Sequence, residues 1–512
     1  MVSLALGLVL FVAFHALGLG PALWLRARTR LPARYLALLI AASTALVSYG
    51  IFWIAIVAPR LRSPSVAAAL AASIALAAWL RWGGRPWEGL DREAWLPPLL
   101  AGALAAAWLA PLIAAPPPIN ERLAWVLPSD NVLPGLFAAR VMRGEALARP
   151  MPPLWADGDR ATERPPLQTA VVIGLSPLLR GTTPFEYQLL ATLCQALWLP
   201  ALWLVAAACG MRGRRLAFVL VACALSGFFY VNTVYTWPKL FAATLMLGAV
   251  AIAMEPPAGD AAADRDRTIV AIALCALALL AHPGPVFTLI AIPVCWPWLR
   301  PIVRLGWTWP ALAAGTVVAA ALFAPWLAYQ ALVDPPTGRL LREHLADGRL
   351  DGTAAHAIVA ANVARPLGEQ VRVRLANLAA QLGDLTVAVW PFPWQHAQRE
   401  QFFHHGASLG VLLVGLVVAV LPWARAPGAG AEPVRRLAIL ALVALAIWSL
   451  LVFPEGAALV HHGSPVTTAL LFVAGACGLT RLPLPAQLIA MGLHGTAFVL
   501  VWLLPILRAA AP

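Results

Sequence analysis

The chain has 512 residues, of which 61% are hydrophobic and only 12% are charged, and its mean hydropathy is +0.79. Soluble domains are about one quarter charged, so this much apolar surface excludes a water-soluble fold. The formal net charge is +13, and Lys239 is the single lysine among 36 basic residues. Most arginines lie in short connections between apolar runs, as topology signals do, and we therefore expect no nucleic-acid partner.

Apolar runs long enough to cross about 30 Å of hydrocarbon recur along the whole length. They predict an all-α polytopic membrane protein of about 14 transmembrane helices, with extracytoplasmic loops that carry short juxtamembrane helices. The expected spans are roughly 2–25, 35–58, 64–81, 97–116, 186–209, 214–233, 236–254, 267–282, 284–299, 308–332, 407–424, 435–453, 460–480 and 485–507. The six cysteines all fall inside such runs, so neither a disulfide framework nor a zinc site is predicted. The first span lacks a basic start and a cleavage site, which indicates that it is retained.

Arginine-rich connections orient the spans, because such connections stay in the cytoplasm. They lie at 26–34, 81–93, 212–215, 265–267, 300–304, 425–436 and near Arg481. All of them share one side if the segment 167–180, which is too short for an ordinary span, is a juxtamembrane or re-entrant helix. The extracytoplasmic side then receives the two long loops, the helix break at His282, and the connections 232–238 and 455–462.

Four segments follow from the order of spans and loops. They are an N-terminal transmembrane extension at 1–96, a core at 97–332 with the first extracytoplasmic loop at 117–185, an extracytoplasmic loop or lid at 333–406, and C-terminal transmembrane helices at 407–512. The lid contains a predicted helix near 366–382 and ends in several aromatic residues. Aromatic residues at this depth also suit an interfacial belt, so a static cap and a lid that orders on substrate binding both stay open.

The first long loop places a carboxylate at the start of a short helix. Ser129 or Asp130 is expected to cap a partly amphipathic helix over 131–143, which can lie at the membrane interface. The Asp130 carboxylate would then face a membrane cavity rather than bulk water. Capping alone also accounts for an aspartate at this position, so both interpretations stay open.

A basic residue follows in the same loop, just before the next helix. Pro165 and Pro166 fix an extended segment and present Arg164 near the membrane surface, where a guanidinium can hold a phosphate bidentately. The alternative is an ordinary charged loop ahead of a helix. The stretch 157–159, Asp-Gly-Asp, offers carboxylates to a divalent cation, but three residues do not make a site and no metal ligand is assigned.

Together these residues resemble the first external loop of GT-C membrane glycosyltransferases, most closely the aminoarabinose transferase and protein O-mannosyltransferase group. The resemblance lies in Asp130, in Ala139-Arg140-Val141-Met142-Arg143-Gly144, and in Glu163-Arg164-Pro165-Pro166-Leu167. Members of that superfamily take sugars from polyprenyl-phosphate donors. The resemblance implies that Asp130 is the catalytic base or positions the acceptor. It also implies that Arg140 and Arg164 bind the donor phosphate and that Glu163 contacts substrate.

Further candidates lie at the ends of later spans on the same side. A cation at the start of an apolar span is costly unless it snorkels or meets an anion, so Lys239 is either an interface anchor beside Trp237 or a clamp on the lipid phosphate. His282 ends an apolar run, where it can serve the helix end or face substrate. Adjacent His461 and His462 point in different directions on a helix, so they are a poor metal pair, but either can meet the sugar or the phosphate.

The sequence therefore predicts transfer of a sugar from a polyprenyl-phosphate-linked donor to an acceptor at the extracytoplasmic face, by inverting displacement with Asp130 as base. The expected partners are membrane lipid, the lipid-linked donor, and an acceptor that is a lipid, a glycan or a protein. No cofactor is assigned beyond the donor, and a divalent metal stays open. A transporter or flippase of an anionic lipid-linked substrate is the alternative, and a non-catalytic binding subunit is a third class. The Ala- and Arg-rich composition suggests a bacterial inner membrane, with the active site facing the periplasm.

Overall fold

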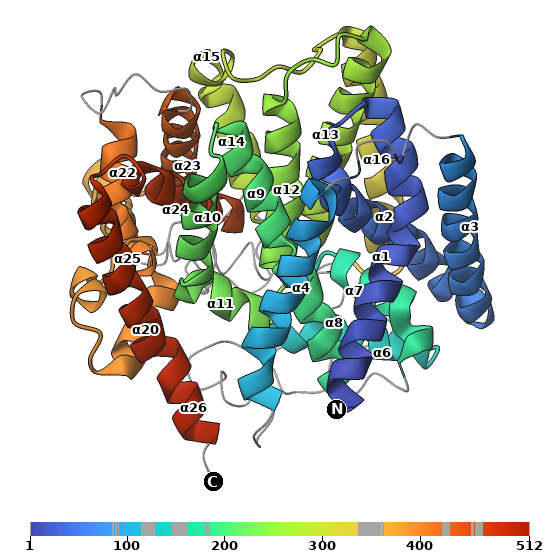
Figure 1. Cartoon of the computed structure of the whole chain (residues 1–512), viewed down its shortest axis with the longest axis horizontal. Helices are drawn as coiled ribbons and strands as arrows, with labels where there is room; N and C mark the ends of the chain where they lie inside the picture. Colours follow the sequence, from blue (N-terminus) through green and yellow to red (C-terminus); the bar gives the residue numbers. More distant parts are fainter. Residues whose placement is uncertain are drawn as a thin grey trace. The chain divides into compact units, whose positions relative to one another are not determined.

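The computed structural model describes residues 2–83, 87, 90, 92–113, 129–145, 162, 164–179, 184–335, 360, 363–421, 431–451, 455 and 464–510. Within these ranges every regular element is a helix (Figure 1). Eight helices there are long and apolar enough to cross a membrane, or nine if one bent pair counts as a single span. The expectation of an all-α polytopic membrane protein is confirmed, and the larger span count stays a prediction.

Two compact units make up the chain. Unit 1 comprises Met1–Ala208, Asn232–Pro283 and Pro301–Pro335. Its helices are α1 (Val2–Thr29), η1 (Ala33–Tyr35), α2 (Leu36–Val57), η2 (Pro59–Leu61), α3 (Arg62–Trp82), α4 (Arg92–Ile113), η4 (Ser129–Val132), α6 (Leu133–Met142), α7 (Leu167–Leu175), η6 (Ser176–Leu178), α8 (Pro184–Ala196), α9 (Trp198–Ala208), α12 (Lys239–Met254), α13 (Ala261–Ala281) and α16 (Trp309–Leu332). The sequence analysis divides the chain into four segments, and that division stays a prediction.

Unit 2 comprises Cys209–Val231, Gly284–Arg300 and Pro336–Pro512. Its helices are α10 (Gly213–Ala224), α11 (Gly227–Val234, which continues into unit 1), α14 (Pro285–Val294), α15 (Trp296–Leu299), α19 (Leu367–Ala380), η7 (Leu385–Ala388), α20 (Trp394–Phe403), α21 (His405–Leu409), α22 (Leu412–Val420), α23 (Ala431–Leu451), α24 (Pro465–Leu479), α25 (Leu484–Phe498), η9 (Val499–Leu503) and α26 (Leu504–Ala510). Helix α19 lies where the sequence predicts a helix in the second long loop.

The arginine-rich connections of unit 1 meet at one end of its helices. The Arg34 guanidinium donates to both carboxylate oxygens of Glu255, at 2.7 and 2.8 Å, and the Tyr35 hydroxyl donates to the same carboxylate. Arg267 donates to the carbonyl oxygens of Thr29 and Arg30, which the end of α1 leaves without helical partners. The connections 26–34 and 265–267 therefore share one end, as the charge pattern predicts.

Polar side chains and glycines let the first helices of unit 1 pack closely. The Thr44 hydroxyl of α2 donates to the Phe14 carbonyl of α1 at 2.7 Å, and the Ser73 hydroxyl of α3 donates to Ala16 at the same distance. The Gly20 amide donates to Ser73, and a Cβ at Gly20 would overlap the backbone of α3. Small residues at helix contacts are typical of membrane bundles, because they bring backbones together.

Two short helices, α6 and α7, pack on each other in unit 1, and Figure 1 shows α6 toward the end at which the chain starts. All nine residues of α7 are buried, and a helix of that length is too short to cross about 30 Å of hydrocarbon. This agrees with the expectation that 167–180 does not span the membrane. The predicted cap of α6 is wrong: its cap position is Val132, because the 3-10 turn η4 precedes the helix.

Glycines also mediate the contact between α22 and α24 in unit 2. A Cβ on Gly415 would overlap the carbonyl oxygen of Gly475, and a Cβ on Gly478 would overlap that of Gly415.

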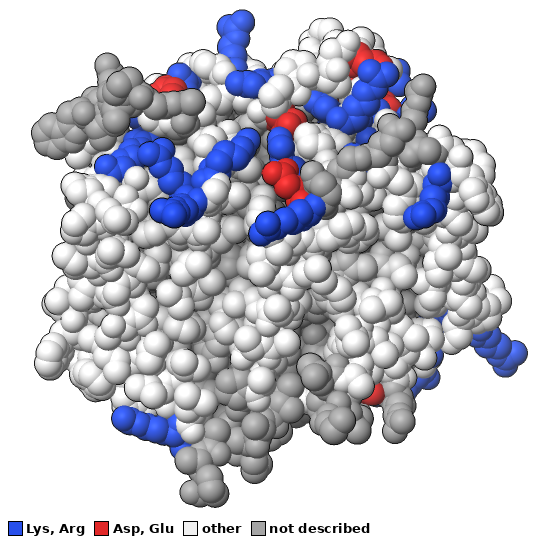
Figure 2. Space-filling model, viewed as in Figure 1, with Lys and Arg blue, Asp and Glu red and all other residues white. Residues whose placement is uncertain are grey.

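The loop after α19 is fixed by Asp384, which accepts hydrogen bonds from the Thr386 hydroxyl at 2.6 Å and from its amide at 2.9 Å. On the face drawn in Figure 2, charged side chains gather in the upper part and at the bottom of the view, with a broad uncharged band between them.

Candidate functional site

Three of the residues singled out in the sequence come together in unit 1. The charges of Lys239 and Arg164 both act on the imidazole of His282, which places the three side chains near one another. They come from three separate segments: the start of α12, the segment before α7, and the end of α13. Two cations near one histidine are an arrangement that suits an anion.

The turn before α12 holds Lys239 under an aromatic ring. The Lys239 ammonium nitrogen lies 3.9 Å from the centroid of the Trp237 ring, and the side chain is only 2% exposed. The Trp237 ring also packs edge-on against His282, with centroids 5.9 Å apart. Thr236 adopts φ +62°, a left-handed conformation that is costly for a β-branched residue and that turns the chain here. Trp237 therefore orients the lysine and the histidine together.

The start of α12 offers a bound anion two favourable groups, the backbone amides of the first helical turn and the Lys239 ammonium. Lys239 occupies the first residue of α12, a helix of 16 residues, where the helix dipole is positive and disfavours a cation. Burial adds a desolvation cost for the ammonium group. A bound anion would therefore suit this position.

The segment that carries Arg164 is tied to the end of α16. The Thr162 hydroxyl donates to the Asp334 carboxylate at 3.0 Å, and the Gln330 amide donates to the Thr162 carbonyl at 2.8 Å. Asp334 is 1% exposed and Thr162 is 2% exposed. Pro166 is the cap residue of α7, as the two prolines in the sequence indicate. These contacts anchor Thr162, which lies two residues before Arg164.

Sequence reasoning missed Asp334 and Thr162 as parts of this site. The signal for Asp334 was available, because an acidic residue directly follows an apolar span there and begins the second long loop. Thr162 carried no signal, since a threonine in a polar loop is ordinary. Only the fold brings the two together across 172 positions of sequence.

The turn that carries Asp130 lies next to the lysine turn. The Tyr187 hydroxyl is 2.6 Å from the carbonyl oxygen of Asn131 and 3.3 Å from that of Thr236. A single hydroxyl therefore touches both the residue after Asp130 and the turn before Lys239. Asn131 itself is 2% exposed, so this part of the first loop is packed into unit 1.

The other predicted site residues are placed in different ways. Arg140 is buried on α6, which packs on α7. The side chain of Asp130, and the residues Glu163, His461 and His462, lie outside the described part of the chain. Their predicted roles stay predictions.

No group of three or more metal-binding side chains occurs among the described residues. The Asp-Gly-Asp stretch at 157–159 lies outside them. Four of the side chains predicted to bind substrate are described: Arg140, Arg164, Lys239 and His282. The first three are ordinarily cations at neutral pH, and cations suit an anion rather than a metal ion.

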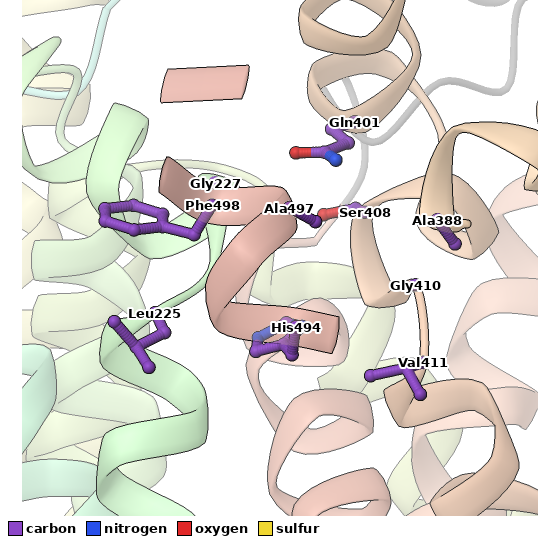
Figure 3. Close-up of a pocket in the computed structure, with 10 residues that line it drawn as sticks. All are labelled: Leu225, Gly227, Ala388, Gln401, Ser408, Gly410, Val411, His494, Ala497 and Phe498. Carbon is purple, nitrogen blue, oxygen red and sulfur yellow. The ribbon is translucent and has the colours of Figure 1, made fainter. Parts of the chain in front are cut away.

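A separate small pocket lies in unit 2 (Figure 3). Gln401, Ser408 and His494 contribute its polar side chains, among apolar neighbours such as Phe498. Its volume of about 20 Å³ admits a water-sized group but not a sugar ring. His494 contacts the carbonyl oxygen of Ala222 at 2.9 Å, near the end of α10. This pocket contains none of the predicted site residues, and the cluster of Lys239, Arg164 and His282 in unit 1 is the stronger candidate.

Comparison with known proteins yields one solved structure. The chain matches no protein-family model and no curated protein. It is similar to the crystal structure of ArnT from Cupriavidus metallidurans bound to undecaprenyl phosphate, with 17% sequence identity and a TM-score of 0.46. The match covers 78% of this chain and 63% of the ArnT chain, so the chain spans less than two thirds of that protein. A likeness of this degree concerns the fold alone.

Proposed function

We propose that the protein transfers a sugar from a polyprenyl-phosphate-linked donor to an acceptor hydroxyl at the extracytoplasmic face of a bacterial inner membrane. One observation carries the proposal. Lys239 and Arg164 both lie near His282, and the turn before Lys239 shares the Tyr187 hydroxyl with the turn that contains Asp130. The acceptor is a lipid, a glycan or a protein.

The proposed chemistry needs a general base and cations that stabilise the leaving phosphate. The acceptor oxygen attacks the anomeric carbon, the bond from that carbon to the phosphate oxygen breaks, and the configuration inverts. Asp130 takes the proton of the acceptor hydroxyl, while Arg164 and Lys239 stabilise the charge that develops on the departing polyprenyl phosphate. Arg140 is a further phosphate ligand in this scheme.

Histidines and Glu163 complete the proposed substrate site. His282 lies beside the two cations and can donate a hydrogen bond to the sugar or to the phosphate. Glu163, His461 and His462 are assigned to substrate contacts on the sequence alone. No metal step enters this scheme.

The test is transfer of radiolabelled sugar by the purified full-length protein. Polyprenyl-phosphate-linked hexoses and pentoses serve as donors, and products are separated into lipid, glycan and protein fractions. Asp130→Asn should lower kcat by about 100-fold to 10,000-fold, the usual contribution of a positioned base. Glu145→Gln is the matched control, because this carboxylate ends the same part of the loop but pairs with exposed Arg143. Equal turnover of Asp130→Asn and wild type would remove the base assignment.

The alternative is a carrier that moves the same lipid headgroup across the membrane without making a bond. The observation that favours it is the 62° bend between α10 and α11, because broken helices are common where transporters bind substrate. Reconstituted vesicles distinguish the two. Movement of a polyprenyl-phosphate sugar between leaflets, without covalent transfer to any fraction, would support the carrier and contradict the enzyme.

A further inference from the structure

A chain of buried polar side chains joins the turn of Asp130 to the turn of Lys239. The Tyr187 hydroxyl donates to the carbonyl oxygen of Asn131 at 2.6 Å, its shortest contact. The same hydroxyl accepts a hydrogen bond from the Gln168 amide at 3.0 Å. Because a hydroxyl has one proton, the nearer carbonyl receives it, and Tyr187 anchors the residue next to Asp130.

The chain of contacts continues to both sides of Lys239. The Gln168 amide also donates to the carbonyl oxygen of Thr236, at 2.7 Å. The Gln168 side-chain oxygen accepts from Gln195 at 2.6 Å, and the Gln195 oxygen accepts from the backbone amide of Phe241 at 2.9 Å. Thr236 and Phe241 lie three residues before and two residues after Lys239, so the network holds the lysine segment from both sides.

Side chains of this kind are costly to bury unless they are hydrogen-bonded, and all three are hydrogen-bonded here. Tyr187, Gln168 and Gln195 are 3%, 1% and 0% exposed. The Gln168 amide nitrogen donates to the Tyr187 hydroxyl and to the Thr236 carbonyl, which uses both of its protons. Its side-chain oxygen accepts from Gln195. A satisfied polar network in an apolar bundle rigidifies the groups that it joins. The packing is also specific, because a Cβ at Gly135 would approach the Tyr187 ring to 2.7 Å.

We propose that Tyr187, Gln168 and Gln195 are positioning residues that fix the distance between Asp130 and Lys239. The inference rests on the proposed function, in which base and cation act on opposite sides of one anomeric carbon. A displacement of about 1 Å between such groups can cost about 100-fold in rate. The network joins the two backbone segments directly, so it sets that distance without touching substrate.

The first experiment uses Tyr187→Phe, which keeps the ring against Gly135 and removes only the hydroxyl. Its matched control is Tyr49→Phe, because Tyr49 is 4% exposed and its hydroxyl donates to the carbonyl oxygen of Leu322 in α16. We expect kcat of Tyr187→Phe to fall about 10-fold to 100-fold, with the donor KM within about twofold of wild type. The control should keep both constants. Wild-type kcat in Tyr187→Phe, in protein that transfers sugar, would overturn the proposal.

The second experiment does not depend on activity. Lys239 is the only lysine, so the rate at which an amine-reactive ester labels its peptide reports on that turn alone. We expect Gln168→Leu to change this rate about fivefold, because it removes the bonds that fix Thr236. Tyr49→Phe should leave it unchanged. An unchanged rate in Gln168→Leu would contradict the network, whereas absence of sugar transfer in wild type would contradict only the proposed function.

Discussion

Replacing Lys239 by methionine isolates the contribution of one buried charge. Methionine keeps an unbranched side chain of similar length and removes the ammonium group that lies 3.9 Å from the Trp237 ring centroid. A hydrogen bond from a charged donor is worth about 1.5–3 kcal/mol. The expected loss in affinity for polyprenyl phosphate is therefore about 10-fold to 150-fold. Arg164 stays in place, so binding should weaken rather than vanish.

Ligand-induced stabilisation measures this loss directly. At a polyprenyl phosphate concentration of 100 times the wild-type Kd, binding stabilises the protein by about 2.7 kcal/mol. A variant with a 100-fold higher Kd would gain only about 0.4 kcal/mol under the same conditions. Thermal unfolding in detergent should therefore show a clear ligand-dependent rise in Tm for wild type and almost none for Lys239→Met.

Controls separate the charge from the shape. Lys239→Arg keeps the charge and should retain part of the response, and uncharged polyprenol should stabilise neither protein. In wild type, polyprenyl phosphate should also slow amine labelling of the single lysine. If Lys239→Met responds to polyprenyl phosphate as wild type does, the lysine is an interface anchor and the phosphate clamp is wrong.

Three other predictions concern the scaffold and can be checked by thermal unfolding. Glu255→Gln should cost about 2–4 kcal/mol, because it breaks the largely buried pair with Arg34, and a loss below 1 kcal/mol would refute the pairing. Gly415→Ala should cost about 1–3 kcal/mol through overlap with α24, while Gly492→Ala, with no atom within 4 Å of the new methyl group, should be neutral or stabilising. Hydrogen bonds from a threonine and a histidine lower the pKa of Asp384 to about 2. The carboxylate therefore contributes fully to the free energy of unfolding above its ordinary pKa of about 3.9, and this contribution is lost as pH falls through 2. Asp384→Asn should be less stable than wild type at pH 6, and this difference in stability should shrink between about pH 4 and pH 2.

The sequence predicted best what depends on composition and on chain order. Apolar runs identified the membrane helices, and arginine positions correctly placed the connections around Arg34 and Arg267 at one end of unit 1. The rarity of lysine drew attention to Lys239, and the structure brings it to Arg164 and His282. These signals are local, so they survive without knowledge of the fold.

The sequence could not predict which groups the buried polar side chains bond to. Gln168 and Gln195 were visible as amides inside apolar stretches, but a sequence does not tell which of many helices will satisfy them. Tyr187 bonds across 56 residues to Asn131, and that pairing depends on the packing of α6, α7 and α8. The cap of α6 failed for a local reason: a 3-10 turn can replace a side-chain cap, and both begin with the same residue types.

The placement of charge along α12 favours bond chemistry over carriage. Lys239 stands at one end of this helix and Glu255 follows its other end, about 24 Å away at 1.5 Å per residue. Every residue from Leu240 to Met254 is uncharged. A carrier would have to release the phosphate from Lys239 into this stretch, where an isolated anion is costly. The proposed enzyme needs the anion only at the Lys239 end of α12, where Arg164 also acts on His282 and where Tyr187 joins the lysine turn to the turn of Asp130.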